Sequence, residues 1–115
     1  MRLDEIGVVS WLIADKAGWH DRPTGDMDRV GLQLALVHSE VSEALDAYRH
    51  RGLEAWHKPD GKPEGMASEL ADVIIRVAEL AHDQGIDLHV AVQEKIAYNR
   101  IRADVPNRSD TTKKF

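Results

Sequence analysis

The chain has 115 residues, of which 43% are hydrophobic and 30% charged, a balance that suits one domain with one hydrophobic core. Its formal net charge of −5 at pH 7 excludes the basic surface of a general nucleic-acid-binding protein, so no stable nucleic-acid binding is expected. It has no cysteine, which excludes disulfides and thiolate metal sites.

The N-terminal stretch MRLDEIGVVSWLIAD is a poor signal peptide, because its apolar run is short, follows Asp4 and Glu5, and lacks a small-residue cleavage site. No stretch approaches the roughly 18 uninterrupted apolar residues of a membrane span. We therefore expect a soluble, cytoplasmic protein with no membrane partner.

The first expected helix covers residues 3–17 and ends at Gly18. Its apolar stripe repeats at helical spacing and consists of Ile6, Val9, Ile13 and Ala17. The residues that follow, 19–25 (WHDRPTG), are expected to form a loop, because proline and glycine interrupt them.

The second expected helix begins at Asp26 or Asp28, either of which can cap it, and continues to about Arg51 before Gly52. One apolar stripe runs along it, formed by Val30, Leu34, Val37, Val41, Leu45 and Tyr48. A second loop is expected at 53–63, which is rich in proline and glycine.

The third expected helix starts near Pro63 or Glu64 and closes at Gln84 and Gly85, and Asp87 is expected to cap a fourth helix that fades near residue 103. The third and fourth helices are joined so tightly that we expect them to be antiparallel neighbours. Four helices with short connections predict an all-α bundle with almost no strand.

Two pairs of carboxylates lie on the second and third expected helices: Glu40 with Glu43, and Glu69 with Asp72. Residues three apart lie one turn apart on the same face of a helix. Each pair borders an apolar stripe, so the four acids meet if the two stripes pack together. Clustered carboxylates repel one another, and Mg²⁺, with Mn²⁺ as a substitute, would remove that repulsion.

A single acid pair is commonplace on a solvated helix, because 30% of this chain is charged. Two pairs on successive helices, both beside an apolar stripe, favour a metal site. The di-iron bundle motif Glu-x-x-His is absent, because the third residue after Glu43 is Asp46 and the third after Glu69 is Asp72. The pattern therefore favours a site with oxygen ligands alone.

Three segments together resemble the MazG-type all-α nucleoside triphosphate pyrophosphohydrolases and the related dCTP pyrophosphatases. They are LALVHSEVSEALDAYR (34–49), ELADVIIRVAELAHDQGIDL (69–88) and EKIAYNRIRAD (94–104). The family pattern is Glu-x-x-Glu, then Glu-x-x-Asp, then Lys-x-x-x-Asn-x-x-Arg, which corresponds here to Glu40/Glu43, Glu69/Asp72 and Lys95/Asn99/Arg102. The resemblance covers residues 1–103, so we expect one MazG-like domain there and a flexible basic C-terminal tail at 104–115.

The resemblance implies a four-helix MazG-like bundle completed by homo-oligomerisation into a dimer or tetramer. It implies Mg²⁺-dependent hydrolysis of a nucleoside triphosphate, with a deoxynucleotide expected, to the monophosphate and pyrophosphate, as in nucleotide-pool house-cleaning. All four acids would be metal ligands, with Glu40 or Glu43 as the catalytic base.

Lys95, Asn99 and Arg102 form one stripe on the fourth expected helix, because they are separated by steps of four and three residues. A polyphosphate substrate gives this stripe a role, since cations and an amide can hold phosphate oxygens. Without the carboxylates, a solvated basic face would be the preferred interpretation.

The base of a nucleotide needs a flat apolar partner and a few polar groups. Trp19 is the preferred stacking residue, and the other base-binding predictions are His38, Tyr48, His50 and Trp56. The alternatives are that Tyr48 belongs to the core, that Trp56 anchors its loop, and that His38 is structural or exposed. Trp11 is expected in the core.

Two positions differ from the family pattern. Many members have a further glutamate where this chain has Ser39, and some dCTP-preferring relatives have tyrosine where it has Arg76. The alternative function is a non-catalytic MazG-like module that binds a nucleotide or metal. A DNA-binding helical protein is disfavoured by the charge.

Overall fold

The computed structural model describes residues 1–21 and 25–103. Its elements in chain order are α1 (Leu3–Lys16), α2 (Met27–Arg51), β1 (Trp56–His57), β2 (Pro63–Glu64), α3 (Met66–Asp83) and α4 (Leu88–Ala103). The expected tail at 104–115 and part of the first expected loop, 22–24, lie outside the described residues.

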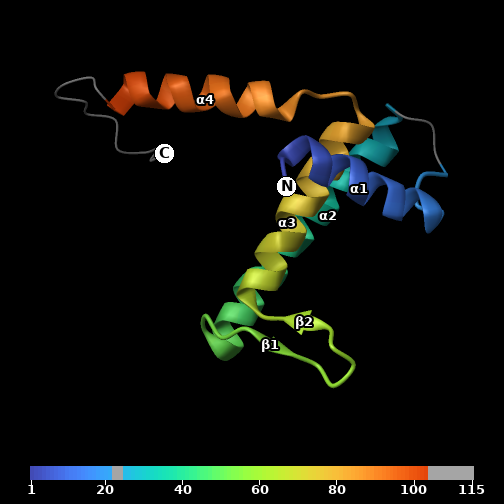
Figure 1. Cartoon of the computed structure of the whole chain (residues 1–115), viewed down its shortest axis with the longest axis vertical. Coiled ribbons are helices and arrows are strands. Elements are labelled where there is room, and N and C mark those ends of the chain that lie inside the picture. The colour runs from blue at the N-terminus through green and yellow to red at the C-terminus, as the bar shows by residue number, and fades with distance from the viewer. Residues whose placement is uncertain (22–24, 104–115) are drawn as a thin grey trace.

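Helices α2 and α3 form a long antiparallel pair that is the centre of the structure (Figure 1). Helix α1 crosses α3 near one end of this pair, and the β1–β2 hairpin lies at the other end (Figure 1). The prediction of a mostly helical chain with four helices is therefore confirmed for residues 1–21 and 25–103. Within the described residues, no helix is both long and apolar enough to cross a membrane.

Several helix ends are where the sequence places them. The Asp26 carboxylate accepts hydrogen bonds from the backbone N–H groups of Asp28 and Arg29, at 2.9 and 3.1 Å, and caps α2. Gly52 follows α2 with a φ of 59°. Asp87 accepts a 3.1 Å bond from the backbone N–H of Val90 at the start of α4.

The start of α3 was predicted too early. Pro63 and Glu64 pair with His57 and Trp56 in a short antiparallel hairpin, so the helix begins at Met66. Gly65 joins the hairpin to α3 with a φ of 111°, and a Cβ there would lie 2.5 Å from the Glu54 carbonyl oxygen. The two-residue strands are too short to leave a period-two pattern in the sequence.

The apolar core of the described chain is small. Its buried hydrophobic residues are Ala14, Ala44, Ala78 and Ala81. Helices α1 and α3 approach closely because Gly7 has no side chain, and a Cβ there would lie 2.7 Å from the Ala78 carbonyl oxygen. Small residues thus bring the helices together, while many large apolar side chains stay exposed.

The face that α2 turns toward α3 differs from the prediction. Arg29 and Gln33 contact Asp83 of α3, and Glu40 contacts Arg76, so the polar stripe of α2 faces its neighbour. Most of the predicted apolar stripe is instead about half exposed, including Leu34, Val41, Leu45 and Tyr48. The acids meet across the helix pair, but the apolar stripe of α2 does not form the core of the single chain.

The expectation that α3 and α4 are antiparallel neighbours is wrong within one chain. Helix α4 turns away after residues 84–87 and extends from the α2–α3 pair (Figure 1). Its main contacts among the described residues are with α1, and none of its own residues is buried. Its apolar residues fall on more than one face, which explains why no single stripe fixes it against α3.

Candidate metal centre between α2 and α3

Three carboxylates converge where the start of α3 packs beside α2. Glu40 and Glu43 extend from one turn of α2, and Glu69 extends from the first turn of α3. One oxygen from each lies within 4.8 Å of the others. Opposite ligands of an octahedral Mg²⁺ ion lie roughly 4.2 Å apart, so small side-chain movements would bring all three into its coordination sphere.

Glu40 is the buried member of this triad, with its side chain 8% exposed. Its Oε1 atom accepts a 2.7 Å hydrogen bond from Nε of Arg76, one turn beyond Asp72 on α3. Its Oε2 atom is buried and has no hydrogen-bond partner among the described residues. A buried carboxylate oxygen without a partner is costly, so this atom is suited to an additional cation.

The acids of the triad differ in proton affinity. Burial, together with the charges of Glu43, Asp72 and Glu40, raises the pKa of Glu69 to about 7. Contact with Glu40 raises the pKa of Glu43 above its ordinary value. Burial alone would raise the pKa of Glu40, but the hydrogen bond and charge of Arg76 help to hold it below its ordinary value. The cluster therefore shares protons when no metal neutralises it.

Asp72, the fourth predicted ligand, is not part of this close group. It lies one turn beyond Glu69, half-buried, and its pKa is raised by burial and by the charge of Glu40. Ser39 is exposed and bonds the Leu36 carbonyl oxygen at 2.7 Å, so it does not take the place of a fifth acid.

A pocket of about 470 Å³ opens beside the triad, between the end of α2, the hairpin and the start of α3. Its walls include Glu43 and Glu69, and also two of the predicted base-binding residues, His50 and Trp56. Arg51 lies over the Trp56 ring, with its guanidinium carbon 4.0 Å from the ring centroid. The pocket thus joins the acids to an aromatic ring and a cation.

The other predicted base-binding residues do not line this pocket. Trp19 is 64% exposed after α1, and Tyr48 belongs to the exposed stripe of α2. His38 is also exposed on α2. Their roles in base binding stay predictions.

The predicted phosphate-binding stripe lies on α4, with Lys95 exposed and Asn99 and Arg102 half-buried. Because α4 extends away from the α2–α3 pair, a single chain does not bring this stripe to the carboxylates (Figure 1). The role of the stripe stays a prediction, and it needs either a partner chain or a different placement of α4.

The sequence pattern did not predict the hairpin or the contact of Arg76 with the acids. Glu64 lines the pocket and pairs with Lys58 and Lys62 at 3.4 and 3.2 Å. Arg76 differs from the family pattern, and its position four residues after Asp72 also places it on the same face of α3. That spacing was the available signal for its contact with the acids.

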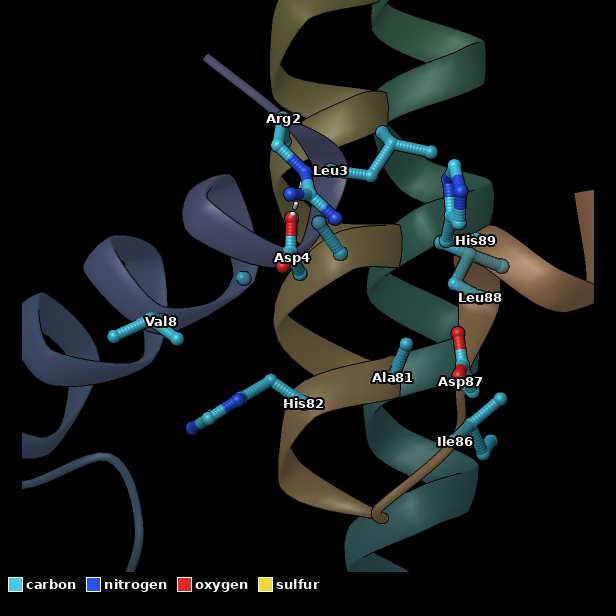
Figure 2. Close-up of a pocket in the computed structure, with 12 residues that line it drawn as sticks. Arg2, Leu3, Asp4, Val8, Ala81, His82, Ile86, Asp87, Leu88 and His89 are labelled. Atoms are coloured by element: carbon cyan, nitrogen blue, oxygen red, sulfur yellow. Dashed lines mark ion pairs between the residues drawn. The ribbon is translucent and has the colours of Figure 1, made fainter.

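A second cavity, of about 280 Å³, lies between α1, α3 and the start of α4 (Figure 2). Its charged groups already have local partners: Arg2 pairs with Asp4 at 3.3 Å, and Asp87 caps α4. His82 and His89 lie on different sides of it (Figure 2). These residues form no metal-ligand cluster of the kind found at the triad.

Comparison with protein-family models, with curated proteins and with solved structures finds no match to this chain. The MazG-type resemblance therefore stays a prediction that depends on its three motif segments.

Proposed function

We propose that this protein is a Mg²⁺-dependent nucleoside triphosphate pyrophosphohydrolase, which releases pyrophosphate from a nucleotide bound beside the acidic triad. The observation that carries the proposal is the buried, unpartnered Oε2 of Glu40 beside Glu43 and Glu69, at the edge of an open pocket. A divalent cation fits this oxygen-only ligand set. The MazG-type motif, which includes all three residues, supports the same function.

Glu40, Glu43 and Glu69 would hold Mg²⁺, which would offset the charge that builds on the phosphates during cleavage. Glu43 is the better of the two proposed bases. It is exposed beside the pocket, and its raised pKa favours proton uptake from an attacking water near neutral pH. Glu40 is less suited, because Arg76 bonds its Oε1 atom and helps to hold its pKa below the ordinary value.

The pocket supplies groups for the rest of a nucleotide. Arg51 is held over the Trp56 ring and presents a guanidinium group to the phosphates, while His50 offers a polar contact. Because Arg51 covers one face of Trp56, a base that stacks on this ring would use the other face or displace the arginine.

We also propose that the active protein is a homo-oligomer. The exposed apolar stripe of α2 and the exposed Leu70 and Ile74 of α3 would be buried against a second copy. The core of small side chains supports this proposal, because alanines alone bury little apolar surface. An α4 supplied by a partner chain would bring Lys95, Asn99 and Arg102 to the carboxylates.

A second candidate is a non-catalytic module that binds a metal or nucleotide. The observation that favours it is the separation of the Lys95–Asn99–Arg102 stripe from the acids within one chain. Binding of Mg²⁺ or a nucleotide without turnover would support this candidate.

The deciding experiment is a panel of canonical and modified nucleoside triphosphates and deoxynucleoside triphosphates, incubated with the full chain and Mg²⁺. Pyrophosphate and orthophosphate are measured separately. Pyrophosphate release with any substrate, lost on addition of EDTA, supports the proposal. Orthophosphate release alone, or no release across the panel, contradicts it.

A further inference from the structure

Arg76 places a positive charge inside the acidic cluster. It extends from α3 to the buried Glu40 of α2, and the 2.7 Å contact joins Nε to Oε1. The Arg76 side chain is itself only 27% exposed. Breaking the pair would leave the largely buried guanidinium group of Arg76 without its carboxylate, so the contact is expected to persist when a metal binds.

Glu40 therefore offers a metal one oxygen, Oε2, that has no hydrogen-bond partner among the described residues. Its Oε2 is buried without a hydrogen-bond partner in the described chain, whereas Oε1 is occupied by Arg76. Two metal ions roughly 3.5–4 Å apart are a recognised arrangement for phosphate chemistry. A carboxylate that bridges such a pair uses both oxygens. In Glu40 the Oε1 atom already accepts the bond from Arg76, whose positive charge would repel a second cation at that atom.

The charges of the cluster support the same conclusion. Four carboxylates, Glu40, Glu43, Glu69 and Asp72, lie near one guanidinium group. If all four carboxylates are ionised, the positive charges of Arg76 and one divalent cation leave the cluster with a single formal negative charge. A second divalent cation would reverse the sign to positive, which is unfavourable until a nucleotide brings its own negative charges.

We propose that Arg76 takes the place of a second metal ion, so that the free protein binds one divalent cation at Glu40, Glu43 and Glu69 rather than two. This inference rests on the metal site of the proposed function. It predicts that any additional metal ion arrives with the phosphates of the substrate. Arg76 is a positioning residue here, because it acts by fixing Glu40.

The test counts Mn²⁺ ions bound to the full chain without nucleotide, by electron paramagnetic resonance of free Mn²⁺. The wild-type chain should bind one ion per chain, and Glu43→Gln should lose it. Arg76→Ala frees both oxygens of Glu40 and should bind two ions. Arg76→Lys keeps the charge and should bind one, as should the control Arg100→Ala, whose arginine is exposed on α4.

Two ions or none in the wild-type chain would overturn the inference, whether or not the variants fold. One ion in both the wild-type chain and a folded Arg76→Ala variant, with helicity checked by circular dichroism, would also overturn it. The count is independent of turnover. If the ion numbers are as expected and no nucleotide is cleaved, the proposed function fails while the inference about Arg76 stands.

Discussion

Trp11 donates a 2.8 Å hydrogen bond from its indole Nε1 to Oδ1 of Asp83, and this contact joins α1 to the last turn of α3. The Asp83 side chain is 1% exposed and also pairs with Arg29 of α2. Burial alone would raise the pKa of Asp83, but the hydrogen bonds from Trp11 and Gln33 and the charge of Arg29 hold it below its ordinary value. One buried carboxylate thus connects three helices.

Replacement of Trp11 by phenylalanine should destabilise the fold by about 1.5–3 kcal/mol, because it removes a hydrogen bond to a buried charged group. The aromatic contact with His20, whose ring lies 4.7 Å away, can be kept by phenylalanine. The matched control is Trp19→Phe, since Trp19 is 64% exposed. Urea denaturation measures both variants, and equal stabilities would show that the Trp11–Asp83 bond contributes nothing.

The local features of the fold could be predicted from the sequence. The caps at Asp26 and Asp87 and the end at Gly52 depend on neighbouring residues, and all three are where the pattern placed them. The contact of Trp11 with Asp83 could not be predicted, because it joins residues far apart in the chain and has no periodic signal.

The candidate site was predictable in part, because part of it also depends on neighbouring residues within one helix. The spacing within each acid pair fixes which residues share a helix face, so the meeting of Glu40, Glu43 and Glu69 followed once α2 and α3 packed. Which face of α2 packs inward was predicted wrongly. Hydrophobicity favoured the stripe that includes Val41, but the polar contacts of Arg29 and Glu40 with α3 prevail in the single chain.

The metal-free protein should lose stability as pH rises from about 4.5 to 7, through the contribution of Glu69. Its pKa is raised from 4.5 to about 7 on folding, so the folded chain holds more protons in this window than the unfolded chain. The expected decrease in the free energy of unfolding is on the order of 1–3 kcal/mol. Urea denaturation in EDTA at pH 5 and 7.5 measures it against Glu69→Gln, which should show a smaller decrease. The same pH dependence in both proteins would contradict the contribution of Glu69. Addition of Mg²⁺ should restore stability at the higher pH to the wild-type chain but not to Glu69→Gln.

Glu43→Gln should abolish Mg²⁺-dependent pyrophosphate release, because the amide removes both a metal-ligating charge and the proposed base. The substitution keeps the size of the side chain, and Glu43 is exposed, so helicity should be unchanged. Glu94→Gln on α4 is the matched control, since it makes the same change at an exposed glutamate outside the triad. Unchanged turnover in a folded Glu43→Gln variant would end the catalytic assignment.

Trp56→Ala and Trp19→Ala separate two predictions for the nucleotide base. Trp56 lines the pocket beside the triad, so its loss should raise KM several-fold and change kcat less. If Trp19 stacks the base, as the sequence suggests, Trp19→Ala should raise KM in the same way. Steady-state kinetics on the best substrate of the panel compares the two. An unaltered KM in both variants would exclude both rings as the base platform.

The exposed stripe of α2 predicts how the proposed homo-oligomer could be disrupted. Val41 is 52% exposed in the single chain and lies between Leu34 and Leu45 along this stripe. Val41→Glu should shift the protein to monomer, because it would bury a charge against the second copy. Ser42→Glu is the matched control, since the neighbouring position is exposed and points to a different side of the helix. Sedimentation equilibrium measures the mass of each variant.

If α4 of a partner completes the site, the Val41→Glu monomer should also lose pyrophosphate release while it keeps Mn²⁺ binding at the triad. A monomeric wild-type chain with full activity would contradict both the oligomer and the shared site.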